Sequence, residues 1–177
     1  GFDAVNTITL TTPVLAGVET LNIIANDNVT ITALTSATAL TNVAVTGEGK
    51  VSITSGALAL NVNSVIDASA VNADVTLDFF QATANGVSLK AGNGNNNLDG
   101  TNIAGKGNTI VSGDGNSTID GGQADDIITA GNGNNTITAG AGNDTITVGN
   151  GNNTIGAVSG NNTITAGNGI NVITTGN

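Results

Sequence analysis

The carboxylates best placed to carry out chemistry lie within one short stretch of the chain. Asp125 and Asp126 are adjacent, and Asp144 follows soon after them. A pair of carboxylates can act as acid and base in glycoside hydrolysis. Such a site also needs a deep cleft and aromatic rings that stack on sugars, whereas the chain has three Phe and no Tyr or Trp. We therefore do not expect these carboxylates to be catalytic.

The composition argues against other enzyme classes too. The chain has 177 residues and contains no His, Cys or Met, which removes Ser-His-Asp triads, thiol nucleophiles and ordinary zinc or haem sites. Its net charge is -10, with 3 Lys+Arg against 13 Asp+Glu. Three scattered lysines cannot follow a nucleic-acid backbone, and no apolar run is long enough to cross a membrane. We expect no enzyme, no nucleic-acid partner and no membrane insertion.

A nine-residue repeat dominates the second half of the sequence. Segments such as AGNGNNTIT (130–138) and AGAGNDTIT (139–147) follow one another, each ending on an aliphatic residue flanked by polar ones. The aliphatic positions are Leu98, Ile110, Ile119, Ile128, Ile137, Ile146, Ile155, Ile164 and Ile173. Their spacing is nine from Ile110 onward, and a three-residue excess around 100–103 predicts a bulged loop. A disordered low-complexity tract would not keep this register.

Each repeat predicts one short strand and one turn. In Thr-Ile-Thr, the two-residue period of a strand directs the Ile inward and both Thr outward. Gly-Asn-Gly-Asn-Asn consists of residues that tolerate turn conformations. Two such nine-residue units make one complete coil, so the sequence predicts an all-β fold: a two-sided parallel β-solenoid, or β-roll.

The first half repeats with a longer period. Leu21, Val43 and Val65 recur at a constant interval of 22, and Val29-Thr30-Ile31 is matched by Val51-Ser52-Ile53 at the same interval. Val75-Thr76-Leu77 follows with two extra residues. No helical periodicity is evident. We predict one continuous solenoid in two regions, with wide 22-residue coils over 1–90 and narrow 18-residue coils over 91–177.

The turn sequences also bear a resemblance to a known family. GGQADD (121–126) and AGAGND (139–144), each followed by an aliphatic strand, resemble the Gly-Gly-x-Gly-x-Asp-x-aliphatic-x nonapeptide of RTX proteins. The upstream region resembles the β-rich segments that precede such repeats in bacterial surface-layer (S-layer) proteins. The resemblance implies Ca²⁺ bound between stacked turns by the sixth-position Asp and backbone carbonyls.

Turns on the same edge of the roll recur once per coil, that is, in every second repeat, which allows the two edges to be compared. At position six, one edge carries Asn108, Asp126, Asp144 and Asn162, and the other carries Ser117, Asn135, Asn153 and Asn171. Since affinity for calcium rises with the number of charged ligands, the resemblance implies one good site at Asp126 and Asp144. Asp125 would add charge, and Asn108 and Asn162 would form partial flanking sites.

Two alternatives to calcium stay open. Stacked Asn side chains can form hydrogen-bonded ladders, which we favour for the edge without Asp. Lys106 lies on the Asp126 edge and could replace a cation there, although solvation is the simpler role for this residue. Beyond Asp144 the chain has no charged residue.

The favoured function is structural. The resemblance and the absence of catalytic residue types indicate a secreted bacterial protein at the cell surface that self-associates into a surface layer or filament. Its expected partners are further copies of itself and cell-surface polysaccharide. The alternatives are an adhesin or ice-binding module that uses its outward Thr residues, and the calcium-folding tail of a type I-secreted enzyme.

Overall fold

The computed structural model describes residues 8–10, 17–32, 40–54, 64–78, 86–101 and 106–176. Every regular element in these residues is a β-strand, and the strands form two parallel sheets. The nine-stranded sheet contains β1 (Ile8–Leu10), β3 (Val29–Ile31), β5 (Val51–Thr54), β7 (Val75–Asp78), β9 (Asn97–Asp99), β11 (Thr118–Gln123), β13 (Thr136–Ala141), β15 (Thr154–Ser159) and β17 (Val172–Thr175). The eight-stranded sheet contains β2 (Thr20–Ile24), β4 (Asn42–Thr46), β6 (Val65–Ala68), β8 (Ser88–Ala91), β10 (Thr109–Ser112), β12 (Ile127–Ala130), β14 (Thr145–Val148) and β16 (Thr163–Ala166).

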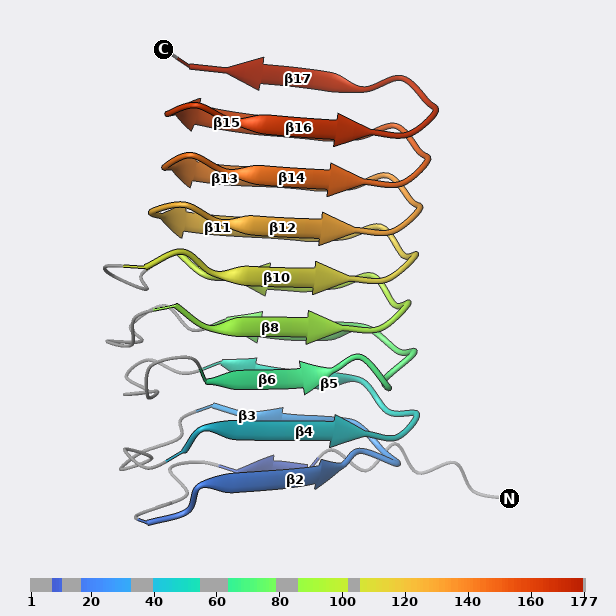
Figure 1. Cartoon of the computed structure of the whole chain (residues 1–177). Helices are drawn as coiled ribbons and strands as arrows, with labels where there is room; N and C mark the ends of the chain where they lie inside the picture. The colour runs from blue at the N-terminus through green and yellow to red at the C-terminus, as the bar shows by residue number, and fades with distance from the viewer. Residues whose placement is uncertain are drawn as a thin grey trace.

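Successive strands alternate between the two sheets, so the chain winds as a solenoid (Figure 1). Each strand pairs in parallel with the strand two further along the sequence. β2 and β17 lie at opposite ends of the stack (Figure 1). The all-β parallel solenoid predicted from the sequence is confirmed. In the described residues no helix is long and apolar enough to span a membrane.

Coil length varies in the first half of the chain and is constant in the second. The offset is 22 between Thr20 and Asn42 and between Val29 and Val51, and it reaches 24 between Val51 and Val75. The offset is 21 between Ser88 and Thr109, and 18 from the Thr109–Ile127 pair onward. Both sheets run through the change without a break, so the 1–90 and 91–177 division stays a prediction. Residues 102 and 103 of the bulged loop predicted around 100–103 lie outside the described residues, so this prediction is not tested.

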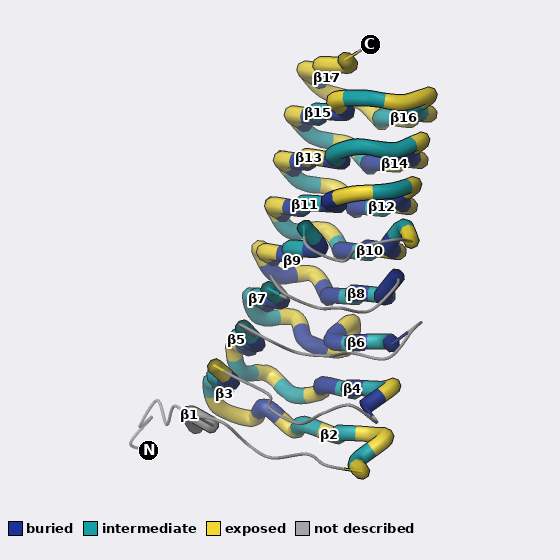
Figure 2. Tube along the Cα trace, turned by 90° about the vertical axis from the view of Figure 1, so that its left-hand side faces the viewer, coloured by how far each residue is buried: buried dark blue, intermediate teal, exposed yellow. Residues whose placement is uncertain are grey.

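The aliphatic residues of both regions form one continuous core. Ile110, Ile128, Ile137 and Ile146 are at most 1% exposed, and the core extends back to Ala25. Figure 2 shows buried positions alternating with more exposed ones along the stacked strands. Each enclosed Ile contributes about 1.5–3 kcal/mol, a gain that requires neighbouring coils above and below.

One register expectation in the wide coils is wrong. Val43 pairs with Ile66 rather than with Val65, which pairs with Asn42. Ile66 is fully buried, while Val65 is only partly buried. Because a one-residue shift exchanges the two faces of a strand, the strict 22-residue period selected the wrong one of two adjacent apolar residues.

Candidate metal centre

The turns of the narrow coils stack into two edges, as the 18-residue period predicted. We call the column Asn108, Asp126, Asp144 and Asn162 the acidic edge. Within it, the backbone N–H of Asp126 donates to Asp144 Oδ1 at 2.9 Å, which confirms that the two carboxylates are neighbours. We call the column Ser117, Asn135, Asn153 and Asn171 the amide edge, and its members are connected in the same manner.

On the amide edge each Asn uses both ends of its side-chain amide. Asn135 Oδ1 accepts the backbone N–H of Ser117 at 3.0 Å. Its Nδ2 donates to the carbonyl oxygens of Gly131 and Gly133, both at 3.2 Å and both in the turn of Asn135 itself. Asn153 Nδ2 likewise donates to Gly151 at 3.0 Å. The ladder expected for this edge is therefore present, and it also closes each turn internally.

The same edge carries a second column of bonds that runs the opposite way. At position five, Asn134 Oδ1 accepts the backbone N–H of Asn152 at 2.8 Å, from the following coil. At position six, Asn153 Oδ1 accepts the N–H of Asn135, from the preceding coil. The position-five column ends at Ile170, whose N–H donates to Asn152 Oδ1 and whose side chain has no oxygen.

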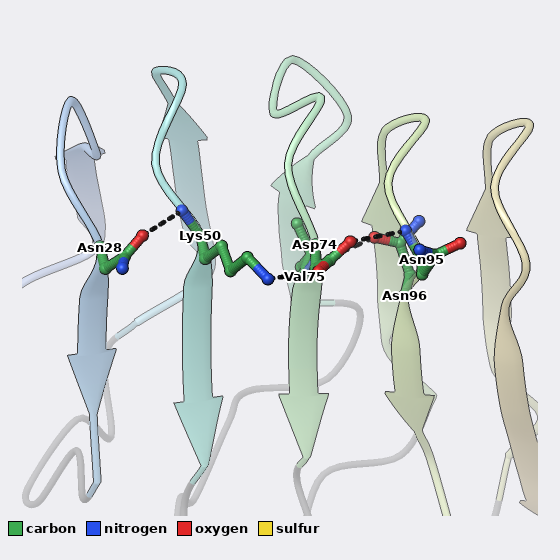
Figure 3. Close-up of polar contacts among 6 residues, drawn as sticks. All are labelled: Asn28, Lys50, Asp74, Val75, Asn95 and Asn96. Carbon is green, nitrogen blue, oxygen red and sulfur yellow. Dashed lines mark hydrogen bonds and ion pairs between the residues drawn. The ribbon is translucent and has the colours of Figure 1, made fainter. Parts of the chain in front are cut away.

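In the wide coils this edge contains an ion pair (Figure 3). Asn28 Oδ1 accepts the N–H of Lys50 at 3.0 Å, and Lys50 Nζ reaches Asp74 Oδ2 at 2.7 Å. Asp74 Oδ1 then accepts the N–H of Asn95 at 3.0 Å. Lys50 together with the N–H of Asn95 holds the pKa of Asp74 below its usual value. Both oxygens of this carboxylate therefore have a donor.

The two carboxylates of the acidic edge are only half satisfied. Asp126 Oδ1 accepts the N–H of Asn108 at 2.6 Å, as Asp144 Oδ1 accepts that of Asp126. The Oδ2 atoms of Asp126 and Asp144 have no hydrogen-bond partner. Both atoms are buried, and each residue is only 1% exposed. A buried unpaired carboxylate oxygen is costly, so each oxygen requires a proton or a cation.

The surroundings of these oxygens are strongly negative. Burial raises the pKa of Asp126 to about 7, and the charges of Asp144, Asp120 and Asp125 add to the effect against the lowering by the Asn108 N–H. Burial also raises the pKa of Asp144, and Asp125 contributes again. The edge therefore holds several carboxylates that favour a neutralising positive charge.

A bound calcium ion fits this arrangement. Calcium takes six to eight oxygen ligands, including carboxylate and backbone carbonyl oxygens. There is room beside Asp126 because residue 121 is glycine, whose added Cβ would lie 2.7 Å from Asp126 Oδ2. No three carboxylates converge as a ligand cluster in the part of the chain that the structure describes. Turn carbonyls would therefore complete the coordination.

The alternative of a lysine cation at this edge is not supported. The ion pairs formed among the described residues are Lys50–Asp74 and Lys90–Asp67. Lys106 is exposed and pairs with neither Asp126 nor Asp144. Its solvated role therefore agrees with the structure.

The other predicted site residues lie close to the two carboxylates in different roles. Asp125 Oδ1 accepts the N–H of Asn143 at 2.6 Å and so ties the two acidic turns together. Asn162 Oδ1 accepts the N–H of Asp144 at 2.8 Å. Asn108 is also in the column, through its own N–H. Whether any of them binds the ion stays a prediction.

Two features of the site were not anticipated from the sequence. Ala124, at position four of the first acidic turn, has φ 77°, a left-handed conformation that is unfavourable for a residue with a Cβ. The equivalent Gly142 and Gly160 also have positive φ, so alignment of the repeats could have shown this strain. Asp120 adds negative charge to Asp126, and its own pKa is raised by burial and by the charge of Asp99.

Comparison with protein-family models identifies the repeats. The model of the RTX calcium-binding nonapeptide repeat (4 copies) matches residues 104–137, 120–155 and 157–177, which we call the RTX region. Its described residues, 106–176, form an RTX-type β-roll. Calcium is thus the ion of this repeat family, and the RTX region contains both Asp126 and Asp144. No curated protein and no solved structure matches the chain.

Proposed function

We propose that the chain is a structural module whose RTX region is locked by calcium between the turns of Asp126 and Asp144. The observation that carries this proposal is the pair of buried Oδ2 atoms without a partner in a calcium-binding repeat. The ion would neutralise both carboxylates and cross-link two successive coils. It would then serve stability rather than catalysis, in keeping with the absence of His and Cys.

We further propose that the protein works outside the cell, as secreted RTX proteins generally do. A site with few charged ligands binds calcium weakly, and extracellular modules use dissociation constants of roughly 10⁻⁴–10⁻³ M. Calorimetric titration of the purified chain should give an affinity in this range. A dissociation constant far below this range would mean that the site is filled in either compartment, so the affinity would no longer support an extracellular role.

The proposed work of the module is self-association into a layer or filament. Ile170 and Val172, in the last described coil, are 76% and 55% exposed, and Val172 pairs with Thr154, whose side chain is also exposed. Their surroundings carry no charge, since no charged residue follows Asp144. An exposed apolar surface without charge favours association with another protein surface. We propose that a second copy of the chain covers it.

Electron microscopy in millimolar calcium and in chelator tests this proposal. We expect sheets or fibres with calcium and dispersed particles without it. The variant Val172→Lys should stay folded in calcium and lose assembly, while Thr163→Lys, on the sheet that lacks β17, serves as the matched control. Dispersed wild-type particles in both conditions would refute self-association.

A second candidate function is binding through the threonine face of the eight-stranded sheet. Thr147 pairs with Thr129 and Thr165, and Thr145 pairs with Thr163, so the predicted columns are in register. Thr145, Thr147, Thr163 and Thr165 are exposed. A regular, uncharged hydroxyl array suits ice or a cell-surface polysaccharide. The variant Thr147→Glu should then abolish ice-growth inhibition or polysaccharide retention without changing calcium affinity.

A further inference from the structure

We propose that the residue at position six decides, coil by coil, whether a turn is closed by its own amide or by a calcium ion. On this basis Asn108 and Asn162 are not partial calcium ligands. Their side-chain NH₂ groups instead occupy the place of the ion. The inference rests on the proposed calcium site at Asp126 and Asp144 and extends it to the other turns.

Every Asn at this position directs Nδ2 toward turn oxygens. Asn162 Nδ2 donates to the carbonyls of Ser159 at 3.2 Å and Gly160 at 3.3 Å. Asn108 Nδ2 donates to Gly121 of the following coil at 2.9 Å and more weakly to Gly100, earlier in its own coil, at 3.4 Å. Asn96, Asn135, Asn153 and Asn171 also donate to carbonyls of their own turns. The pattern holds on both edges and in coils of different length.

Asp126 and Asp144 keep the hydrogen bond that the side-chain Oδ1 accepts, but not the bonds that Nδ2 donates. Their Oδ1 atoms accept the N–H of the preceding coil, as the Oδ1 atoms of the Asn residues do. Asp and Asn have nearly the same shape, so the substitution changes only the second terminal atom from a double donor to an acceptor. If the Asp turns keep the arrangement of the Asn turns, this acceptor faces carbonyl oxygens and is repelled by them. It becomes favourable when a cation lies between them.

The consequence is a rule that can be applied to single residues. Asn162 is stacked on Asp144 through the 2.8 Å bond to its N–H. The variant Asn162→Asp should therefore create an additional calcium site beside the existing one. The double variant Asp126→Asn/Asp144→Asn should remove the existing site and supply two amides that need no metal.

The test combines calcium stoichiometry by calorimetry with thermal unfolding in chelator, on the full chain. We expect Asn162→Asp to bind about one further ion and to unfold at a lower temperature in chelator than wild type. The double variant should bind none and unfold at a higher temperature in chelator than wild type. Asn161→Asp is the matched control, because it adds the same charge at the exposed position five: it should bind no further ion, and it should lower the unfolding temperature in chelator less than Asn162→Asp does.

The outcomes separate this inference from the proposed function. If wild type binds calcium but Asn162→Asp gains no ion, the rule is wrong and the site at Asp126 and Asp144 stands. If wild type binds no calcium, the proposed function is wrong. The rule is then still decided by chelator stability, because a double variant no more stable than wild type would refute it.

Discussion

The wide and narrow coils of this molecule balance negative charge in different ways. In the wide coils, Lys50 pairs with Asp74 and Lys90 with Asp67, across 2.7 and 3.3 Å respectively. In the acidic turns of the narrow coils, Asp126 and Asp144 have no cationic side chain as a partner among the described residues. The same backbone stacking therefore supports one region that supplies its own cations and another whose buried carboxylates would, on our proposal, take a cation from solution. The difference indicates where the folded state should depend on conditions outside the protein.

Removing calcium should change the contrast between the two regions most. At a calcium concentration of 100 times the dissociation constant, binding adds about 2.7 kcal/mol to the free energy of unfolding. In chelator we expect faster amide hydrogen exchange over 121–148, whereas 42–54 should change little. Equal acceleration in both regions would show that the ion acts on the whole roll and not on the acidic turns.

The pH dependence of the calcium-free protein should come next. Asp126, with a pKa of about 7, and Asp144, with a raised pKa, hold protons more tightly when folded than when unfolded. The free energy of unfolding should therefore decrease as pH rises from about 4 to about 7, by about 1.4 kcal/mol per unit of pKa difference. Urea unfolding at several pH values measures this slope. Saturating calcium or the Asp126→Asn/Asp144→Asn double variant should reduce it to the smaller part contributed by Asp120, whose pKa is also raised, and an unchanged slope there would assign it to other groups.

Relief of backbone strain in the acidic turn should have a smaller effect. Ala124→Gly removes the Cβ from a left-handed conformation and should stabilise the RTX region by about 1 kcal/mol, measured by thermal unfolding in calcium. The matched control is Ala139→Gly, which has no positive φ to relieve and should destabilise. Stabilisation by both variants would exclude strain at Ala124 as the cause.

Breaking the ion pair of the wide coils should have the smallest effect. The side chains of Lys50 and Asp74 are 65% and 40% exposed, and surface ion pairs contribute about 0–1 kcal/mol. Lys50→Gln should therefore lower the unfolding free energy by less than about 1 kcal/mol, equally in calcium and in chelator. A calcium-dependent loss would mean that the two regions are coupled more strongly than their charges indicate.

The fold and the pairing of the acidic turns could be predicted because the repeat is strict. Nine-residue spacing fixed the inward positions from Ile110 to Ile155, and the 18-residue coil brought Asp126 next to Asp144. The register at Val65 and Ile66 could not be predicted, because both residues are apolar and either could face inward. The direction of the Asn amides was also hidden, since sequence spacing places a side chain in a turn without orienting its terminal atoms.

The opposed directions of the two hydrogen-bond columns on the amide edge bear on how the roll grows. When a coil is added after Asn152, its position-five N–H can donate to Asn152 Oδ1 of the existing coil. Its position-six side-chain oxygen accepts the N–H of Asn153 in that existing coil. For a coil added on the N-terminal side the two roles are exchanged: the new coil supplies the acceptor at position five and the donor at position six. Coils can therefore be added at either end of the roll. The side chain of Ile170 has no oxygen, so the position-five column has no acceptor there. A strand stack that pairs beyond this coil could therefore continue only the position-six column.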